Sequence, residues 1–394
     1  MLALTVLLLP LLSTASVHNH RSHDHSHDAA KRLPNTWYHR SDHPVNSLFK
    51  RGAATDGVTY AVVGADGWAA GYPAGPPATL DPSSMPAEWT AALNDAVARK
   101  AIPDVPVSTN ANGSPVYPTG VDPNSPEVCS ATFKCRIAGD IWDAPDGYVG
   151  ISFDDGPTDA SDTLLDFLSA NNQPVTHFII GSNMIWNPAQ FTKAFNNGDD
   201  MAAHTWTHPL MTTKTNAEVV AELGWTIEII HNSTGGRIPK FWRPPYGDSD
   251  ARVTAIAREV FGLQTIIWNQ DTEDWSLTNT PPGTTPQAIN SSMTQWLTGS
   301  KSPGLIALEH ELSEQSVASF IAAYPVMKQN NWKLASLAQL MGNNASYLNA
   351  ASSTADVIGF SNILDAKGGA AASAGGSSSS APGSASAPAG ASKT

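Results

Sequence analysis

The sequence predicts an α/β protein whose main domain is a distorted parallel (β/α) barrel of about seven strands, preceded by an irregular N-terminal extension. Two observations favour this fold. From residue 146 onward, short apolar runs alternate with segments of helical pattern, an order that is typical of a parallel sheet with crossover helices. Polar residues follow the ends of several of these runs, and the functional sites of β/α barrels lie at that end of their strands.

The expected elements run through residues 146–345, which we assign to the main domain. Strands are expected over residues 148–154, 175–181, 200–205, 241–244, 264–270, 304–310 and 332–334. Helices are expected over residues 86–100 in the extension, and over 160–171, 188–196, 216–232, 250–261, 286–298 and 316–330. The polar residues at or just after the strand ends are Asp154, His204, Arg243, Asp271 and His310.

The sequence before the main domain divides into three segments. Residues 1–15 form an apolar run that ends in small residues, which is typical of a secretory signal peptide and too short for a membrane span. Residues 16–51 are polar and rich in histidine, and they end in a dibasic pair. We expect a disordered leader, or a prosegment that is removed at that pair. Residues 52–145 form the irregular extension.

The sequence after the main domain is expected to be an extension over residues 346–365 and a flexible tail of Ser, Gly and Ala over residues 366–394. The tail carries the small residues of a lipid (GPI) anchor signal, but its last stretch, residues 386–394, is not apolar. No stretch after the N-terminal run is apolar enough to cross a membrane. We therefore expect a secreted protein, outside the cell or in the cell wall.

Other features of the sequence also fit an exported protein. Cys129 and Cys135 can pair and close a small loop, and the alternative of a metal site has only these two thiols and no histidine cluster beside them. Sequences of the form Asn-x-Ser/Thr predict N-glycosylation at Asn112, Asn232, Asn290 and Asn344. The formal net charge of −13 argues against a nucleic-acid partner, because no excess of cations is present to displace counterions.

The apolar run over residues 149–153 ends abruptly in Asp154 and Asp155, and a Gly-Pro turn follows. Neighbouring side chains on an extended chain point to opposite sides, so the two carboxylates are expected to have different roles. One can face a bound metal while the other faces a reacting water. A loop with a helix N-cap is the more common explanation of the same four residues, and this pattern alone leaves both interpretations open.

His204 and His208 are spaced as two metal ligands on one face of a helical turn. Together with Asp155 they would make a set of two histidines and one carboxylate with open coordination positions. Such a set suits Zn²⁺ or another divalent first-row metal. A pair of ordinary structural histidines is the alternative interpretation.

Three later segments add candidate residues. Arg243 lies between a strand and two prolines, where it can pair with a carboxylate, or simply belong to a structural loop. Asp271 and Asp274 lie in an acidic segment that is either part of a site or merely solvated. His310 ends an apolar strand and is a structural histidine or, next to a buried acid such as Asp274, a general acid with a raised pKa.

Five segments in this order resemble the motifs of the polysaccharide deacetylases, the NodB homology fold of carbohydrate esterase family 4. They are Ser-Phe-Asp-Asp-Gly-Pro, His-Thr-Trp-Thr-His, Arg-Pro-Pro-Tyr-Gly, Asp-Thr-Glu-Asp-Trp and Leu-Glu-His, and the resemblance covers about residues 146–345. The secreted layout is most similar to that of fungal chitin deacetylases. Two positions depart from the family: Ser152 replaces a usual Thr, and Glu309 replaces an apolar residue. On an alternating strand, Glu309 is expected to point away from the site that His310 faces.

The resemblance implies metal-dependent hydrolysis of N-acetyl groups with one divalent ion, Zn²⁺ or Co²⁺. It makes Asp154 the general base that also meets the substrate, with Arg243 orienting it and Asp274 tuning the general acid His310. The implied metal ligands are Asp155, His204 and His208. The backbone amide of Tyr246 would complete an oxyanion hole, and Trp275 and Leu308 would shape the pocket for the acetyl methyl group.

The resemblance predicts the reaction more specifically than it predicts which polymer is the substrate. Chitin or a chito-oligosaccharide is the expected substrate, and peptidoglycan and acetylxylan are alternatives within the same mechanism. A silent carbohydrate-binding protein of the wall would be expected to lack a base, a ligand or an acid. A metal-scavenging protein would depend on the histidine-rich leader alone. We expect the protein to act as a monomer.

Overall fold

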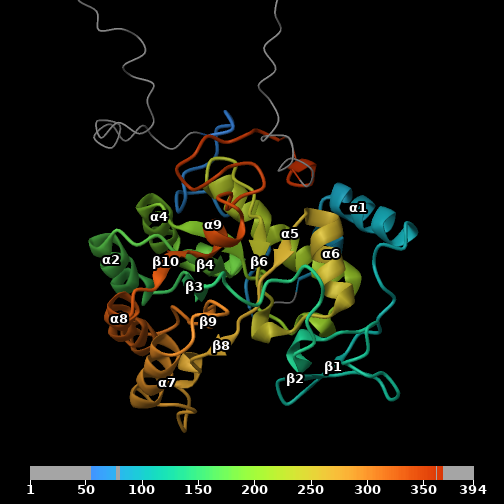
Figure 1. Cartoon of the computed structure of the whole chain (residues 1–394). Helices are drawn as coiled ribbons and strands as arrows, with labels where there is room; N and C mark the ends of the chain where they lie inside the picture. Colours follow the sequence, from blue (N-terminus) through green and yellow to red (C-terminus); the bar gives the residue numbers. More distant parts are fainter. Residues whose placement is uncertain (1–54, 77–79, 361, 367–394) are drawn as a thin grey trace, which may run out of the picture. The chain divides into compact units, whose positions relative to one another are not determined.

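The structure is a computed structural model that describes residues 55–76, 80–360 and 362–366 (Figure 1). The expected signal peptide over residues 1–15 and the leader over residues 16–51, with its dibasic pair, lie outside the described residues. The expected tail also lies outside them, apart from Ala366. Among the described residues, no helix is both long and apolar enough to cross a membrane.

A six-stranded parallel sheet forms the centre of the described chain (Figure 1). Its strands, in spatial order, are β10 (Lys333–Ser336), β3 (Tyr148–Gly156), β4 (Thr176–Ile179), β5 (Asp200–Ala203), β6 (Phe241–Trp242) and β7 (Gln264–Thr265). β10 pairs with the first part of β3, and β4 pairs with its second part. A further parallel pair is formed by β8 (Gln270–Asp271) and β9 (Ala307–Leu308).

The strand pairing curls the sheet towards a barrel. Parallel bridges join Val149 to Leu305 and Asp154 to His310, so the β9 segment lies against β3. β8 follows β7 on the same stretch of chain and pairs with β9, which brings the two ends of the sheet together. The expected β/α barrel is therefore confirmed. The one expected strand over residues 264–270 is observed as the two short strands β7 and β8.

The strands are buried on both faces, as their nearly continuous apolar sequence requires. Along β3, Val149, Ile151 and Phe153 pack against the outer helices. Phe178 of β4 and Ala202 of β5 pack into a cluster inside the barrel. The polar residues that follow these strands therefore lie at one end of a rigid apolar core.

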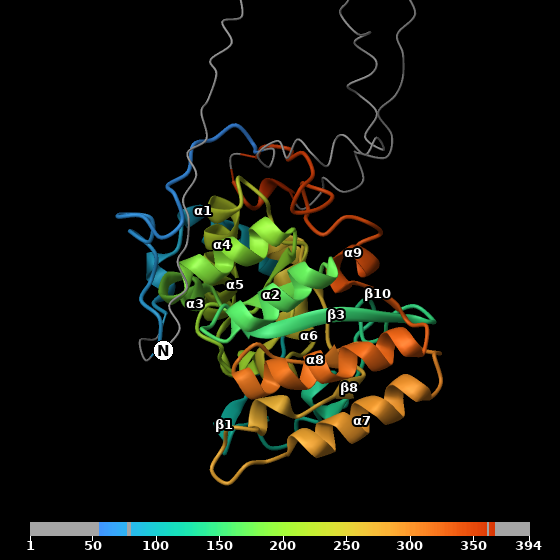
Figure 2. The same ribbon diagram turned by 90° about the vertical axis from the view of Figure 1, so that its left-hand side faces the viewer.

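Nine α-helices surround the sheet in the described part of the chain. They are α1 (Ala87–Ala98), α2 (Ser161–Asn171), α3 (Gly181–Trp186), α4 (Pro188–Asn197), α5 (Asn216–Ser233), α6 (Ala251–Phe261), α7 (Pro286–Thr298), α8 (Glu314–Gln329) and α9 (Leu337–Met341). α7 and α8 pack against each other and lie alongside the long strand β3 (Figure 2). The sequence did not predict α3 and α9, which are too short to show a helical period.

The starts of two helices are set by side-chain caps. Thr215 accepts a hydrogen bond from the backbone of Glu218, and the Glu218 side chain accepts one from the backbone of Thr215, so α5 begins with a capping box. Ser313 and Ser316 form the same reciprocal pair at α8, which begins before the expected residue 316. The cap lies before the first apolar residue of the pattern, and this explains the difference.

The N-terminal extension is anchored to the outside of the barrel. α1 places the Trp89 ring against α5 at Gly224, where an added Cβ would lie 2.4 Å from the ring. Further along, β1 (Thr109–Ala111) and β2 (Ser114–Val116) form a small antiparallel hairpin. Only glycine fits at residue 224, because α1 and α5 approach so closely.

A disulfide bond joins Cys129 to Cys135, which closes the small loop that the sequence predicts. Within this loop, the Ala131 N–H donates to the Ser249 carbonyl, and the Thr132 hydroxyl donates to Asp248. The disulfide loop therefore braces the segment that follows β6.

The end of the described chain crosses the barrel at the N-terminal ends of its strands, near the start of the extension. The Leu348 N–H donates to the Ile238 carbonyl just before β6, and the Asn349 side chain accepts from the Ile238 N–H. The Asp56 N–H donates to the Gly235 carbonyl nearby. In Figure 1 these segments appear in red and blue at the top.

Candidate metal and catalytic site

Asp154 and Asp155 lie at the carboxyl end of β3, as expected. The pairing of β3 with β4 shifts register between Asp154 and Gly156, and Asp155 has a left-handed φ of 70°. Aspartate adopts this conformation more readily than most residues, and a bulge of this kind redirects a side chain. The two adjacent carboxylates consequently meet different partners.

Asp155 lies beside both predicted histidine ligands. Its Oδ1 atom is 3.2 Å from Nε2 of His204 and 3.0 Å from Nε2 of His208. One ligand atom from each of the three residues lies within 4.8 Å of the others. The structure therefore brings the predicted metal triad together.

The protonation of this triad favours a cation. Nδ1 of His204 is 2.7 Å from the Arg243 carbonyl, which can only accept, so Nδ1 carries the proton and Nε2 offers a lone pair. Asp155 Oδ1 is buried and, among the described residues, has no hydrogen-bond partner. Buried lone pairs that face one another are costly unless a positive ion joins them. One carboxylate and two imidazoles are ligands that Zn²⁺ and similar divalent metals accept.

The histidine segment is not the helical turn that the spacing predicted. It is a loop in which Thr205 and His208 have left-handed φ values of 67° and 57°. The backbone N–H groups of Trp206 and Thr207 both donate to the Glu222 carboxylate, at 2.8 Å each. A buried acid of α5, rather than helical hydrogen bonds, therefore holds the loop in place.

Asp154 pairs with Arg243 in the buried interior. Nη1 of Arg243 donates to Oδ1 of Asp154 at 2.6 Å, and both side chains are almost fully buried. The guanidinium lies over the Phe178 ring at 4.1 Å. Burial lowers the pKa of Arg243, and Asp154 opposes that change. The other carboxylate oxygen, Oδ2, lies 3.8 Å from Nε2 of His204, so it faces the triad.

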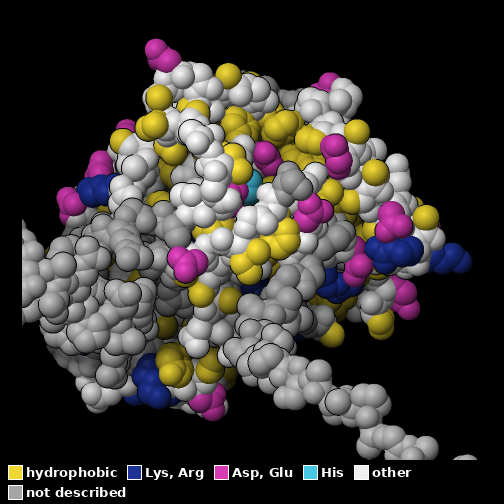
Figure 3. Space-filling model, turned by 90° about the horizontal axis from the view of Figure 1, so that it is seen from above, with side chains coloured by type: hydrophobic (Ala, Val, Ile, Leu, Met, Phe, Trp, Pro, Cys, Tyr) yellow, Lys and Arg dark blue, Asp and Glu magenta, His cyan; other side chains and the backbone are white. Residues whose placement is uncertain are grey.

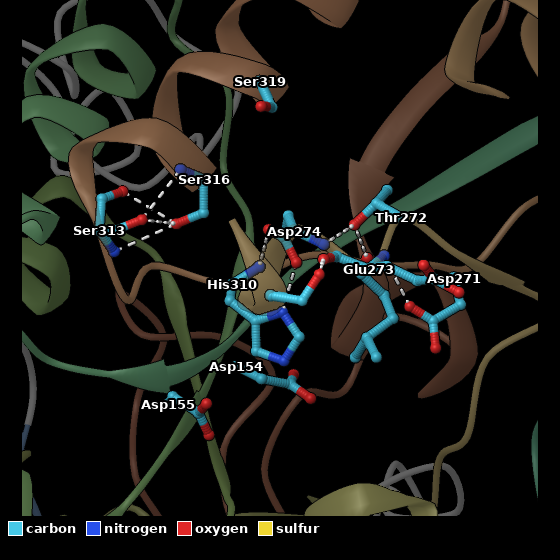
Figure 4. A network of polar contacts seen from close by, with 12 residues as sticks. Asp154, Asp155, Asp271, Thr272, Glu273, Asp274, His310, Ser313, Ser316 and Ser319 are labelled. Carbon is cyan, nitrogen blue, oxygen red and sulfur yellow. Dashed lines mark hydrogen bonds and ion pairs between the residues drawn. The ribbon is translucent and has the colours of Figure 1, made fainter. Parts of the chain in front are cut away.

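His310 lies beside the two aspartates, and Asp274 holds it in place. Oδ1 of Asp274 accepts from His310 Nδ1 at 2.6 Å, and Oδ2 accepts from the His310 backbone N–H at 2.8 Å. The remaining nitrogen of the ring points towards Asp154 and Asp155 (Figure 4). Burial lowers the pKa of His310, but the Asp274 carboxylate outweighs burial and raises that pKa to about 9.

The other predicted site residues differ in exposure. Tyr246 lies in the turn after β6 with a left-handed φ of 59°, and its ring is 60% exposed and 4.7 Å from the His208 ring. Trp275 is 47% exposed, directly after Asp274 and close to the left-handed Glu273. Leu308 is buried in the cluster inside the barrel. Two exposed aromatic side chains thus stand beside a buried polar centre.

Two acids near His310 differ in their surroundings. Glu309 is buried, and burial raises the pKa of its carboxyl well above the usual value, with Asp274 adding to the effect. Asp271 is exposed, and its carboxylate accepts from the backbone N–H of Glu273 within its own loop. Asp271 therefore ends a strand as predicted, but its carboxylate makes a hydrogen bond within its own loop.

Sequence reasoning missed the supporting residues. Glu222 interrupts the apolar run at the start of α5, and a buried acid in such a run was the available signal. Glu311 follows His310, and its carboxylate lies 2.7 Å from Nδ1 of buried His177. Burial lowers the pKa of His177, but Glu311 and Asp199 outweigh burial and raise it to about 10. No motif in the sequence indicated this buried ion pair.

Comparison with known proteins identifies similar chains. A family model described as polysaccharide deacetylase matches residues 143–265. Chitin deacetylase 3 of Cryptococcus neoformans is 39% identical over 337 residues, which cover 84% of this chain and 78% of that protein. The chitin deacetylase of Amylomyces rouxii is 35% identical over 266 residues, which cover 63% of this chain and 62% of that one. The solved structure of a chitin deacetylase from Colletotrichum lindemuthianum aligns with a TM-score of 0.48 and 22% identity, covering 54% of this chain and 96% of that one.

Proposed function

This chain belongs to the polysaccharide deacetylase family, and from that premise we propose that it hydrolyses the N-acetyl groups of chitin, giving acetate and glucosamine units in the polymer. One observation carries the proposal. A buried carboxylate, a set of three ligand atoms and a histidine with a raised pKa converge at one end of the barrel. An acyl transfer to water needs a base, an electrophile and an acid, and this site has a candidate base, a candidate acid and three residues that would hold a metal as the electrophile.

Asp155, His204 and His208 would hold the divalent metal, Zn²⁺ or Co²⁺. When bound there, the metal would polarise the acetyl carbonyl and favour deprotonation of water. The single carboxylate and two imidazoles leave coordination positions for substrate and water.

Asp154 takes the proton of the attacking water. Arg243 occupies Oδ1 of this carboxylate, so Oδ2, which faces the triad, is the atom that receives the proton. The N–H of Tyr246 lies in the turn after β6, and the Tyr246 ring contacts the ring of His208 in the triad. This N–H donates to the oxyanion as negative charge develops, an effect worth roughly 3 kcal/mol per donor in other enzymes.

His310 protonates the leaving amine. An amine leaves poorly without a proton, so the reaction needs an acid on the side opposite the base. Asp274 binds Nδ1 of His310, which leaves Nε2 as the atom that donates. The exposed Trp275 and the buried Leu308 would shape the space for the acetyl methyl group.

We expect the pH dependence of kcat to report His310. The acid must be protonated, so activity should be present below its pKa of about 9 and fall as the pH rises through that value. In Asp274→Asn the negative charge that raises the pKa is removed, and the alkaline limb should move towards the ordinary histidine value of about 6.5. The measurement is initial rate against pH for both proteins. An alkaline limb that stays in place in Asp274→Asn would show that another group donates the proton.

Acetate release tests the proposed reaction and its polymer. We expect release from a chitin oligomer, because a relative that matches this chain over 78% of the relative's own length is named a chitin deacetylase. Peptidoglycan and acetylxylan are run in parallel, and release from one of these alone would assign the enzyme to that polymer. No release from any of the three, with metal bound, would leave a carbohydrate-binding protein without activity.

We place the reaction outside the cell or in the cell wall. The expected signal peptide and the Cys129–Cys135 disulfide support this location. Asn112, Asn290 and Asn344 are exposed and suit N-glycosylation, whereas the side-chain amide of Asn232 is half-buried and makes hydrogen bonds within the fold. Action as a monomer remains our proposal.

A further inference from the structure

A cavity of about 350 Å³ lies between the N-terminal extension and α5. Small-molecule sites range over roughly 300–1,000 Å³, so this cavity is large enough for one small ligand. Its main walls are Tyr60, Trp68 and Tyr72 of the extension and Trp225, Glu228 and Asn232 of α5. The three residues on α5 are spaced by three and four positions, so they lie on one face of the helix. None of the six belongs to the metal and catalytic site.

Hydrogen bonds fix the walls of this cavity. The Asn232 side-chain amide donates to the Tyr72 hydroxyl at 2.8 Å and to Oε1 of Glu228 at 3.2 Å. Nε1 of Trp68 donates to the Ser233 hydroxyl at 3.2 Å. The aromatic rings are therefore held in position before any ligand arrives, which lowers the entropic cost of binding.

The cavity carries negative charge. Glu228 is its one charged lining residue, and no Lys, Arg or His lines it among the described residues. A second carboxylate, Asp56, accepts from the hydroxyl of Tyr60 at 2.7 Å. Figure 3 shows one face of the molecule, on which hydrophobic and acidic side chains occupy the middle and Lys and Arg lie mostly towards the edges.

We propose that this cavity binds a glucosamine unit of the deacetylated polymer through its ammonium group. Aromatic faces attract an ammonium ion, and a carboxylate beside them adds a full opposite charge. The rings of Tyr60 and Tyr72 also cover the apolar face of a sugar. The inference rests on the proposed function, because the ligand is the product of that reaction.

The cavity is separate from the catalytic centre but joined to it through one aromatic contact. The Tyr72 ring stacks on Trp206 at 5.8 Å, and Trp206 lies in the loop that carries both histidine ligands. The same segment of the extension continues past Trp206, whose Nε1 donates to the Ala74 carbonyl. A partly deacetylated chain would thus have two points of attachment, which slows its release.

Titration calorimetry with a fully deacetylated glucosamine hexamer tests the proposal. Ala70 lines the cavity and is exposed, so Ala70→Trp fills the space without removing a contact. Ala65→Trp, at an exposed position outside the lining, is the matched control. We expect Ala70→Trp to abolish the binding event and Ala65→Trp to retain it. Glu228→Gln keeps the shape and the acceptor for Asn232, and it should weaken binding on the order of tenfold.

Two results would overturn the proposal. One is the absence of binding in the unmodified protein, and the other is equal affinity for the N-acetylated hexamer with no effect of Glu228→Gln. Acetate release from a short chitin oligomer is measured on the same preparations, and Ala70→Trp should leave it unchanged. A protein that releases no acetate but still binds the glucosamine hexamer would refute the proposed function alone, so the two failures are distinguishable.

Discussion

Asp154→Asn is expected to lower kcat for acetate release by roughly 10²–10⁴-fold, the usual contribution of a general base. Asparagine keeps the shape of the side chain and can still accept from Arg243, but it cannot take a proton from water. The buried Arg243 also loses its counter-charge, so the free energy of unfolding should fall. The metal content of the variant should remain that of the unmodified protein, since Asp154 is outside the triad.

Asp159→Asn is the matched control for this substitution. Asp159 is an exposed aspartate in the same turn region, and its loss should leave kcat unchanged. The measurements are the rate of acetate release and the metal content of both variants. A rate in Asp154→Asn close to that of the unmodified protein would mean that another group removes the proton.

His204→Ala should remove the metal and with it nearly all activity. The variant leaves only Asp155 and His208 of the set, and two ligands bind a divalent ion far more weakly than three. Metal content measured after exhaustive dialysis should fall below stoichiometric, and the rate should fall to background. His231→Ala changes a histidine outside the triad, so it should keep the metal.

Thermal unfolding provides a second readout that does not depend on activity. A ligand that binds only the folded state raises its stability, so a chelator should lower the Tm of the unmodified protein and added Zn²⁺ or Co²⁺ should restore it. His204→Ala should show neither response. A Tm of the unmodified protein that changes with neither chelator nor added metal would contradict the metal site.

Much of the fold could be read from the sequence because its elements are long enough to show a period. β3 and α5 repeat their apolar residues over many positions, whereas α3 has six residues that include Gly, Ser and Asn, all weak helix formers. The strand expected over residues 264–270 is divided because its two ends pair with different partners, β6 and β9. Pairing of this kind depends on tertiary structure, which the local sequence does not contain.

The candidate site was read from motifs, and its supports were not. The spacing of His204 and His208 correctly indicated two nearby imidazoles but wrongly indicated a helical turn. A helix and a loop with left-handed residues can both place residues four positions apart side by side, and the choice depends on Glu222, which comes from another element. Likewise, the link between Glu311 and His177 joins residues that are distant in the chain.

Five residues other than glycine around this site have left-handed backbones: Asp155, Thr205, His208, Tyr246 and Glu273. Each such residue costs roughly 1–2 kcal/mol relative to the right-handed conformation. Their sum is comparable with the whole net stability of a typical domain, about 5–15 kcal/mol. The left-handed residues at the catalytic end of the barrel therefore lower the net stability of the fold, and burial of the apolar core offsets this cost. A descendant freed from selection for activity could relax these turns or accept glycine there, and it would gain stability as it lost its chemistry.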